Sequence, residues 1–355
     1  MTPAPTSERA LYLDAFRGFT MVGMVSAGFG FRHFADHPVW GAIARQFEHV
    51  AWEGLVFYDL IQPFFMFIVG VVMPFAFERR WAHGETWSQS LKHVLRRAAL
   101  LILFGLLARS IQAGKPTLDL INVLAQVAFT YVVAFLLLRQ SWKVQGAVAL
   151  SLLVLHWALF QFSGFPEPWA RGTNFGAWLD MQVLGKTWGG GYVTVNALSS
   201  AGNTIFGVMA GRLMASTRPA GFKLRVLLAT GIGSIILGLL LSPWVPLVKK
   251  IWTASFTIYS TGFTLLAMAA FYFAVEMRGW QRWPKLFIIV GANSIFIYLF
   301  HEILGRWISQ TGLVFTGWAV NWWGPGGHLL NAWLGIAFQL WTCVWLYRRR
   351  IFFKI

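Results

Sequence analysis

The sequence predicts an all-α membrane protein, a single-domain bundle of about ten transmembrane helices. Hydrophobic residues make up 57% of its 355 residues and charged residues only 12%, with a mean hydropathy of +0.59, which lies outside the range of soluble globular chains. Apolar runs of about 20 residues, the length that crosses a bilayer, recur along the whole chain. Lysine and arginine gather between alternate runs, as loops on one membrane face do.

Ten spans follow from hydropathy and from charged, proline or glycine interruptions. We expect them at residues 11–32, 57–78, 94–113, 119–138, 144–163, 194–215, 224–244, 254–276, 284–305 and 328–347. The opening MTPAPTSERA has neither the basic start nor the cleavage site of a secretory signal, so the first run is expected to remain as an anchor.

The charge pattern predicts orientation. If the N-terminus is inside, most of the 29 lysines and arginines fall in cytoplasmic segments, so both termini are expected in the cytoplasm. Topology and attraction to anionic membrane lipid account for the net charge of +16, so it does not call for a nucleic acid partner.

Two outer segments, about 33–56 and 164–193, are rich in tryptophan, glycine and polar residues and are expected to form folded caps. Their tryptophans suit either interfacial anchoring or the lining of a sugar site. The single cysteine, Cys343, excludes an internal disulfide and a zinc site built on thiolates. No H-E-x-x-H pattern occurs, so no metal is expected.

Ionisable residues inside apolar runs are informative because burying a charge in hydrocarbon is costly. Asp14 and Arg17 are three residues apart and share a helical face, so they form either a structural ion pair or a seat for a charged ligand. Asp59 opens the second span, where it could cap a helix or take part in a site.

His49 stands ten residues before Asp59 in the first cap. Imidazole titrates near neutral pH and can act as a base there. A carboxylate that reaches it would fix its tautomer and stabilise its charged form, as in catalytic triads.

Four stretches carry a resemblance to a known family. They are LDAFRGF in the first span, H-x-x-W-x-G-x-x-x-x-D-L-I-x-P-x-F-x-F-I-V-G at 49–70, KKIWTASF at 249–256 and GANSIFIYLFHE at 291–302. In this order and spacing they resemble the heparan-α-glucosaminide N-acetyltransferase family and its bacterial relatives. The resemblance covers nearly the whole membrane region.

The resemblance implies a membrane acetyltransferase that takes acetyl-CoA from the cytoplasmic side and acetylates a saccharide amine or hydroxyl on the far side. It implies a bacterial inner membrane location and, by analogy with relatives, a homodimer. His49 matches the family's active-site histidine, and Asp59 its aspartate. The remaining matches are Asn293, Ser294, His301 and Glu302 near the C-terminus, and Lys250, Trp252 and Ser255 in the K-x-W-x-x-S stretch, with Trp52 beside the histidine.

Two departures stand out. An ungapped alignment places Gly28 where the family carries a site asparagine, and GGGYVTVNAL replaces the family's acidic D-P-E-G before the sixth span. Both changes indicate an altered acceptor pocket.

The expected chemistry is acyl transfer from a thioester, which needs alignment, a base and an oxyanion donor. His49 would deprotonate the acceptor, Asp59 would orient it, and Asn293 or Ser294 would donate to the thioester oxygen; an acetyl-imidazole on His49 is the competing route. The phosphates of CoA need cations. Arg17, paired with Asp14, and the predicted inner loop at 78–97 could supply them. Topology alone would also make that loop basic. The candidates in and beside this loop are Arg79, Arg80, Arg96 and Arg97. Asn293, Ser294 and His301 could instead bridge membrane helices.

Two other function classes stay open. A secondary transporter of amino sugars would also place polar groups in mid-membrane, and the glycine-rich GFTMVGMVSAGFGF at 18–31 could mark a broken helix. A non-catalytic membrane partner or sensor would not need His49.

Overall fold

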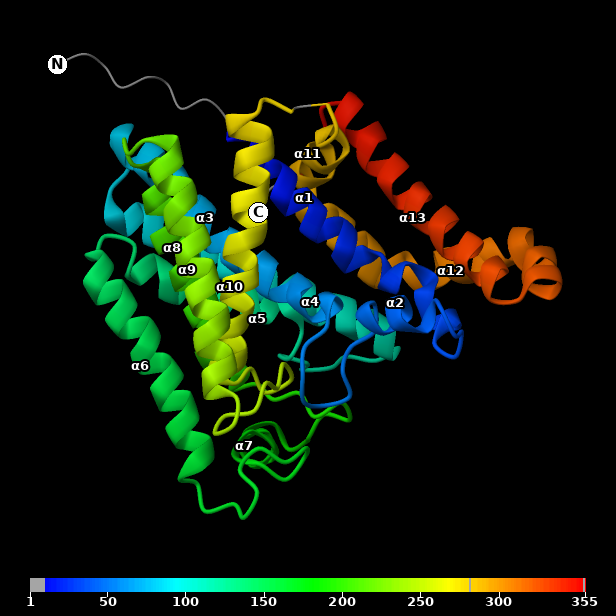
Figure 1. The fold of residues 1–355 in the computed structure, drawn as a ribbon, viewed down its shortest axis with the longest axis horizontal. Coiled ribbons are helices and arrows are strands. Elements are labelled where there is room, and N and C mark those ends of the chain that lie inside the picture. The colour runs from blue at the N-terminus through cyan, green and yellow to red at the C-terminus, as the bar shows by residue number, and fades with distance from the viewer. Residues whose placement is uncertain (1–9, 281, 354) are drawn as a thin grey trace.

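All elements of the described residues are helical (Figure 1). The structure, a computed structural model, describes residues 10–280, 282–353 and 355. Arg9, Lys354 and most of the opening segment, on which the expectation of an uncleaved first span rests, lie outside the described residues.

The elements follow in chain order. They are α1 Leu11–Val25, the 3-10 helix η1 Ala27–Phe34, α2 Gly41–Gln46, the 3-10 helix η2 Phe57–Leu60, α3 Ile61–Ala82, α4 Trp87–Ala113, α5 Val123–Leu136, α6 Trp142–Gln161, α7 Phe175–Leu184, α8 Asn196–Ala215, α9 Ala220–Leu241, α10 Ala254–Phe271, the π-helix η3 Tyr272–Met277, α11 Lys285–Ala292, α12 Ser294–Trp323 and α13 Pro325–Arg348.

Polar caps define where several helices begin. The side chains of Thr86, Asn122, Ser141 and Thr253 each accept a hydrogen bond from the backbone N–H three residues ahead. Such caps satisfy amide groups that have no partner within the helix.

Each of the ten predicted spans overlaps at least one helix, and the described residues form helices and no strands, so the prediction of an all-α protein with several apolar helices is confirmed. By length and composition, five helical stretches can cross a membrane, or six if α11 and α12 form one bent span. The five are Phe57–Ala82, Trp142–Gln161, Ala220–Leu241, Ala254–Met277 and Pro325–Arg348. The total of ten spans, and the location of both termini in the cytoplasm, stay predictions.

Two predicted spans are not continuous. The first ends at Val25, because the chain then makes a left-handed turn from Ala27 to Gly30. The ninth, predicted at 284–305, breaks at Asn293, where α11 and α12 meet at 78°. Helix α12 then continues to Trp323, through residues predicted to be a loop.

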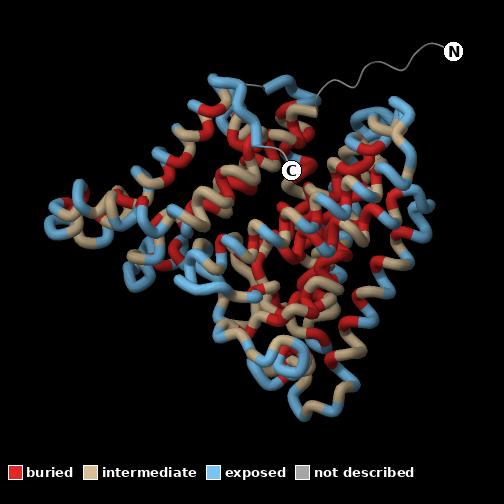
Figure 2. Tube along the Cα trace, turned by 180° about the vertical axis from the view of Figure 1, so that it is seen from behind, coloured by how far each residue is buried: buried red, intermediate tan, exposed pale blue. Residues whose placement is uncertain are grey.

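Helix α3 lies at the centre of the bundle and α9 at its edge. In the most apolar part of the stretch that includes α3, 72% of the residues are buried, against 17% for α9. Figure 2 shows buried residues gathered in the middle of the molecule and exposed ones along the outer helices. The apolar outer faces fit contact with lipid.

The connections gather at two ends. At one end Arg139 stacks over the Trp81 ring and Arg212 donates to the Gln140 carbonyl, which joins three connections predicted to be cytoplasmic. At the other end Trp52 donates to the Trp169 carbonyl, which joins the two predicted caps. Figure 1 places α7, in the second cap, opposite the α8–α9 connection. This arrangement matches the alternation that the charge pattern predicts.

Candidate functional site

His49 and Asp59 lie in direct contact. The Nδ1 atom of His49 is 2.7 Å from Oδ1 of Asp59. Asp59 is fully buried, whereas 42% of the His49 side-chain surface is exposed. The carboxylate also lies 3.4 Å from the backbone N–H groups of Val50 and Val56. Asp59 therefore caps the start of η2 and orients the imidazole at the same time.

Lys249 is the third member of this cluster. Its Nζ is 3.3 Å from Oδ1 of Asp59 and 3.2 Å from Nδ1 of His49. The lysine is 4% exposed, so it is a buried cation beside a buried anion. Such a charge persists in the interior only when it is paired. Lys249 thus neutralises Asp59 and brings a positive charge to the imidazole.

The contact with Asp59 determines which nitrogen of His49 carries the proton. Two acceptor atoms at 2.7 Å would repel, so Nδ1 carries the hydrogen and donates it to the ionised carboxylate. The Lys249 amine, 3.2 Å from the same nitrogen, donates to Asp59 instead. The neutral ring then has its lone pair on Nε2. An imidazole held in this tautomer, on a side chain that lines a cavity, has the form required of a general base.

The surroundings keep the His49 ring neutral. Burial lowers the pKa of His49; the hydrogen bond to Asp59 raises it, and the Lys249 charge lowers it. The balance lies below the ordinary value, so the base form is populated at neutral pH. Burial likewise lowers the pKa of the Lys249 amine, and the Asp59 charge offsets part of this effect.

A tight turn between α9 and α10 presents Lys249. Trp252 adopts a left-handed conformation there, with φ of 56°, which costs a bulky residue on the order of 1 kcal/mol. Its ring is 1% exposed and its indole N–H donates to Asn203 at 2.8 Å. Thr253 closes the turn by donating to the Pro246 carbonyl. Strain of this kind persists where packing holds the backbone in place.

Tyr58 packs against the imidazole of His49. The two ring centroids are 4.9 Å apart, and Tyr58 interacts with Ser26 and the Gly28 backbone. Gly28 has φ of 71°, and a Cβ there would lie 2.5 Å from the Phe47 carbonyl oxygen. A glycine is therefore required at this position, where the resemblance leads us to expect an asparagine, because the backbone of the first cap occupies that space.

His49 opens into a cavity of about 450 Å³, here called the outer cavity. Aromatic, amide and charged side chains line it together. The lining residues are His49, Gln62, Arg109, Asp119, Ile121, Asn122, Val123, Trp188, Gly189, Gly190, Tyr192, Lys249, Tyr298 and Glu302. Arg109 and Asp119 form an ion pair at 2.7 Å. This mixture of aromatic rings and paired charges suits a polar ligand of moderate size.

A second cavity, here called the inner cavity, has about 480 Å³ and lies at the arginine-rich end. Three of the predicted phosphate-binding residues line it: Arg17, Arg80 and Arg97. Arg17 pairs with Asp14 at 2.8 Å, as the spacing predicts. The guanidinium of Arg97 packs 4.8 Å from the centroid of the Tyr131 ring. Deeper in, apolar residues of α3 complete the wall.

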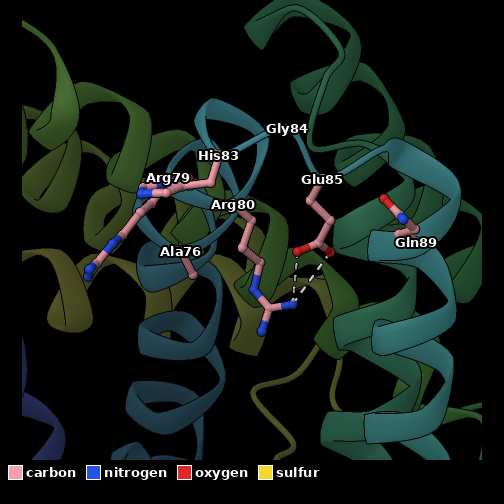
Figure 3. A pocket seen from close by; sticks show the side chains of 7 residues that line it. All are labelled: Ala76, Arg79, Arg80, His83, Gly84, Glu85 and Gln89. Atoms are coloured by element: carbon pink, nitrogen blue, oxygen red, sulfur yellow. Dashed lines mark hydrogen bonds and ion pairs between the residues drawn. The ribbon is translucent and has the colours of Figure 1, made fainter.

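A broad surface recess of about 810 Å³ adjoins the inner cavity, because Ala76 and Arg80 line both. Figure 3 shows Arg80 directed toward Glu85 and Arg79 turned away from that pair. Arg80 lies 3.4 Å from the Glu85 carboxylate and 3.1 Å from Nε2 of His93. Arg79 lines the recess but not the inner cavity. Arg96 is exposed on α4 and lines neither space.

Several predicted site residues have structural contacts near His49. Lys250 donates to the Ala51 carbonyl and so ties the α9–α10 turn to the cap. Trp52 joins the two caps. Ser255 is buried and donates to the Pro246 carbonyl. These residues, with Trp252, hold His49 and Lys249 in place, and none of the four lines the outer cavity.

Of the four matched residues near the C-terminus, Glu302 lines the outer cavity with His49, and the other three lie elsewhere. Asn293 donates to the Ile351 carbonyl and accepts from the Phe353 N–H. Ser294 lines the inner cavity, and its hydroxyl donates to the Gly291 carbonyl. His301 contacts Gln339 between α12 and α13. The structure does not bring these three residues to His49, so their predicted roles as oxyanion donors and substrate contacts gain no support from its geometry.

Lys249, which contacts His49, is one of the residues that sequence reasoning missed, as are Asp119 and Tyr192 in the lining of the outer cavity. Lys249 stands beside Lys250, the lysine that the family motif singled out, and 200 residues from His49 in the chain. Lys249 and His49 come together only through the fold. The sequence signal near Lys249 is the pair of adjacent lysines between two apolar runs. Within the described residues no group of three or more His, Cys, Asp and Glu side chains could hold a metal ion.

Comparisons with known proteins agree with the motif resemblance. A family described as a domain of unknown function (DUF5009) matches residues 9–174. The chain is 22% identical to the heparan-alpha-glucosaminide N-acetyltransferase of Mus musculus over 425 aligned positions, covering 100% of this chain and 62% of the mouse protein. It is 23% identical to the Homo sapiens protein of that name, covering 97% of this chain and 59% of the human protein. The chain thus resembles this family over its whole length and spans less than two thirds of these relatives.

Proposed function

We propose, from this full-length similarity and from the His49 cluster, that the chain is a membrane acetyltransferase. It transfers an acetyl group from acetyl-CoA, bound on the cytoplasmic side, to an amine or hydroxyl of a saccharide on the opposite side. The observation that carries the proposal is the His49 imidazole, held by buried Asp59 and open to the outer cavity.

The chemistry follows from the free Nε2 of His49. The acceptor nitrogen or oxygen attacks the thioester carbonyl, the new C–N or C–O bond forms and the C–S bond breaks. Nε2 takes the acceptor's proton and returns it to the CoA thiolate. Asp59 stabilises the imidazolium that forms between these steps. An acetyl-imidazole route uses the same Nε2 as nucleophile, and rapid quenching with labelled acetyl-CoA distinguishes the two.

The inner cavity and its recess are the proposed CoA site. Phosphates seek guanidinium groups, and Arg17, Arg80 and Arg97 line the inner cavity. The recess at Arg79 and Arg80 gives the bulky nucleotide room, and the apolar α3 wall suits the acyl arm. The thioester would then point from the inner cavity toward His49.

The outer cavity is the proposed acceptor site. Trp188 and Tyr192 offer ring faces, and the carboxylates of Asp119 and Glu302 offer acceptors to hydroxyl or ammonium groups. Rings and carboxylates together are suited to a sugar. The altered segment before α8, with Gly189 and Gly190 in the lining, fits a pocket that differs from that of the relatives.

The test is an acetyl-transfer assay with purified protein in lipid nanodiscs, labelled acetyl-CoA and glucosamine. We expect His49→Gln to reduce the rate by about 100-fold or more, the usual contribution of a general base. His37→Gln is the matched control, because His37 lies in the same cap and its Nδ1 accepts from the backbone of Val39 and Trp40. Equal rates in wild type and His49→Gln would refute the proposal.

The same material tests transport, the alternative function. Proteoliposomes that accumulate labelled amino sugar without acetyl-CoA, and that form no acetylated product, would indicate a transporter. The proposal predicts product formation and no such uptake.

A further inference from the structure

The wall between the two cavities is thin. On α3, Gln62 lines the outer cavity and Phe65, one turn later, lines the inner cavity. On α12, Tyr298 lines the outer cavity and Ile295, again one turn away, lines the inner one. One helical turn rises about 5.4 Å, so a layer of side chains about one turn deep separates the two spaces.

An amide pair lies in this wall. Nε2 of Gln62 donates to Oε1 of Gln126 at 2.6 Å. Gln126 sits on α5 between Val123, which lines the outer cavity, and Tyr131, which lines the inner one. The amide pair therefore joins α3 to α5 within an otherwise apolar layer that includes Phe65 and Tyr298.

One amide group of this pair lacks a hydrogen-bond partner. Gln126 is 4% exposed, and its Nε2 group has no hydrogen-bond partner among the described residues. A buried amide donor without a partner is destabilising, and more so in a membrane interior, where water does not replace the missing bond. An unpartnered donor in a wall between two cavities points to a ligand that completes it.

We propose, on the basis of the acetyltransferase function above, that Gln126 and Gln62 bind the acyl-pantetheine arm of the donor as it crosses this wall. The arm carries two amide carbonyl oxygens that take no part in the reaction, and each can accept from an amide N–H. Gln126 Nε2 donates to one of these oxygens, and Gln62 exchanges its bond to Gln126 for a second contact with the arm. The pair thereby places the thioester at the cavity that His49 faces.

In this proposal the amide pair contacts the pantetheine arm and not the nucleotide of CoA. The nucleotide of CoA lies outside the wall in the proposed site, so its contacts do not depend on the amide pair. Because the arm is held equally before and during the reaction, the loss of these contacts weakens donor binding with little effect on the chemical step.

The test compares Gln126→Met and the double variant Gln62→Met/Gln126→Met with wild type in nanodiscs. Methionine keeps similar volume and removes the donor. Calorimetry measures binding of acetyl-CoA and, separately, of 3′-phosphoadenosine 5′-diphosphate, the nucleotide part without the arm. Steady-state assays give kcat and KM for acetyl-CoA. The control is Gln145→Met on α6, because Gln145 is also fully buried with an unpartnered amide atom, its Oε1, and borders neither cavity.

We expect the two wall variants to bind acetyl-CoA about tenfold more weakly and to raise KM similarly, as the loss of one or two hydrogen bonds implies. Affinity for the nucleotide alone should match wild type, kcat should stay within about threefold, and Gln145→Met should bind both ligands normally. Unchanged binding of acetyl-CoA in the wall variants, or a parallel loss of nucleotide affinity, would overturn the assignment. A wild-type protein that neither binds acetyl-CoA nor transfers acetyl groups would refute the proposed function itself, which is a different result.

Discussion

At the scale of single residues, His49, Asp59 and Lys249 depend on one another. Asp59 is a buried anion whose charge is balanced by Lys249 and whose hydrogen bond orients His49. Removing one charge leaves the other buried without a partner, which usually costs more than the pair contributes. Stability and activity should therefore respond differently to single and paired substitutions.

The first prediction separates these two effects. Asp59→Asn should lower acetyl transfer by about 100-fold or more, because the imidazole loses the anion that fixes its tautomer. It should also lower stability by about 3 kcal/mol, since Lys249 remains buried. Thermal unfolding in detergent and the transfer assay measure the two quantities.

The double variant Asp59→Asn/Lys249→Met is the control for this prediction. Removing the unpaired cation should restore much of the melting temperature, whereas activity should stay low. Recovery of activity together with stability would show that Asp59 acts only as a partner for Lys249.

The second prediction concerns pH. His49 acts as a base only when neutral, so activity is lost as pH falls through its pKa. Burial and the Lys249 charge lower that pKa, which places the acidic limb of kcat/KM below the ordinary histidine value of about 6.5. Lys249→Met removes a positive neighbour and should move this limb to higher pH. Lys186→Met, in the second cap, should leave it in place, and a shift to lower pH in Lys249→Met would contradict the account.

Sequence could predict part of this cluster. The motif placed His49 and Asp59 ten residues apart, and their chemistry suggested contact. It did not indicate Lys249, because the contact depends on the left-handed turn at Trp252. Asn293 looked like an oxyanion donor by motif, yet its amide holds the C-terminal segment at the α11–α12 bend. A sequence shows which polar groups are buried more readily than it shows what they bind.

At the scale of elements, α3 is positioned by close packing against α8. A Cβ on Gly207 would lie 2.1 Å from the Phe67 carbonyl oxygen, and one on Gly70 would lie 2.0 Å from that of Thr204. Small residues allow membrane helices to approach in this way. Since α3 follows directly from η2 and Asp59, this contact also fixes the depth of the site.

The third prediction tests this contact. Gly207→Ala should lower the melting temperature and reduce acetyl transfer, because the added methyl group forces α3 away from α8. Gly233→Ala on α9 is the matched control, since a Cβ there meets open space. That variant should be neutral or slightly stabilising, as alanine favours a helix over glycine by about 1 kcal/mol. Equal stability of the two variants would exclude the packing role.

The helices themselves were predicted well, because an apolar run in lipid must satisfy its own backbone. Their ends were predicted less well. The first span stops at the turn around Gly28 and Gly30, and the ninth bends at Asn293. Hydropathy averages over about 19 residues and does not register a single residue that redirects the chain.

At the scale of the whole molecule, acetyl transfer across the membrane requires one site open to each membrane face. The outer caps adjoin His49, and the arginine recess adjoins the inner cavity, with the amide wall between them. Charge patterning predicted the alternation of segments between the two ends. The two cavities could not be predicted from the sequence, because each is lined by residues from several helices that are far apart in the chain.

The fourth prediction tests the two faces directly. The sequence contains one cysteine, Cys343, which is buried, so a Cys343→Ser background accepts single reporters. Asp36→Cys in the first cap and His83→Cys at the recess should react with a membrane-impermeant maleimide from opposite sides of sealed vesicles. Labelling of both from the same side would exclude transfer across the membrane.

The most direct test of the central claim is a sided transfer assay in vesicles of uniform orientation. Labelled acetyl-CoA is supplied only on the face of the arginine recess and glucosamine only on the face of His49. The account predicts acetylated product on the His49 face for wild type, and its loss in His49→Gln with CoA binding retained. Product that appears only when both substrates share one face, or that persists without the imidazole, would contradict it.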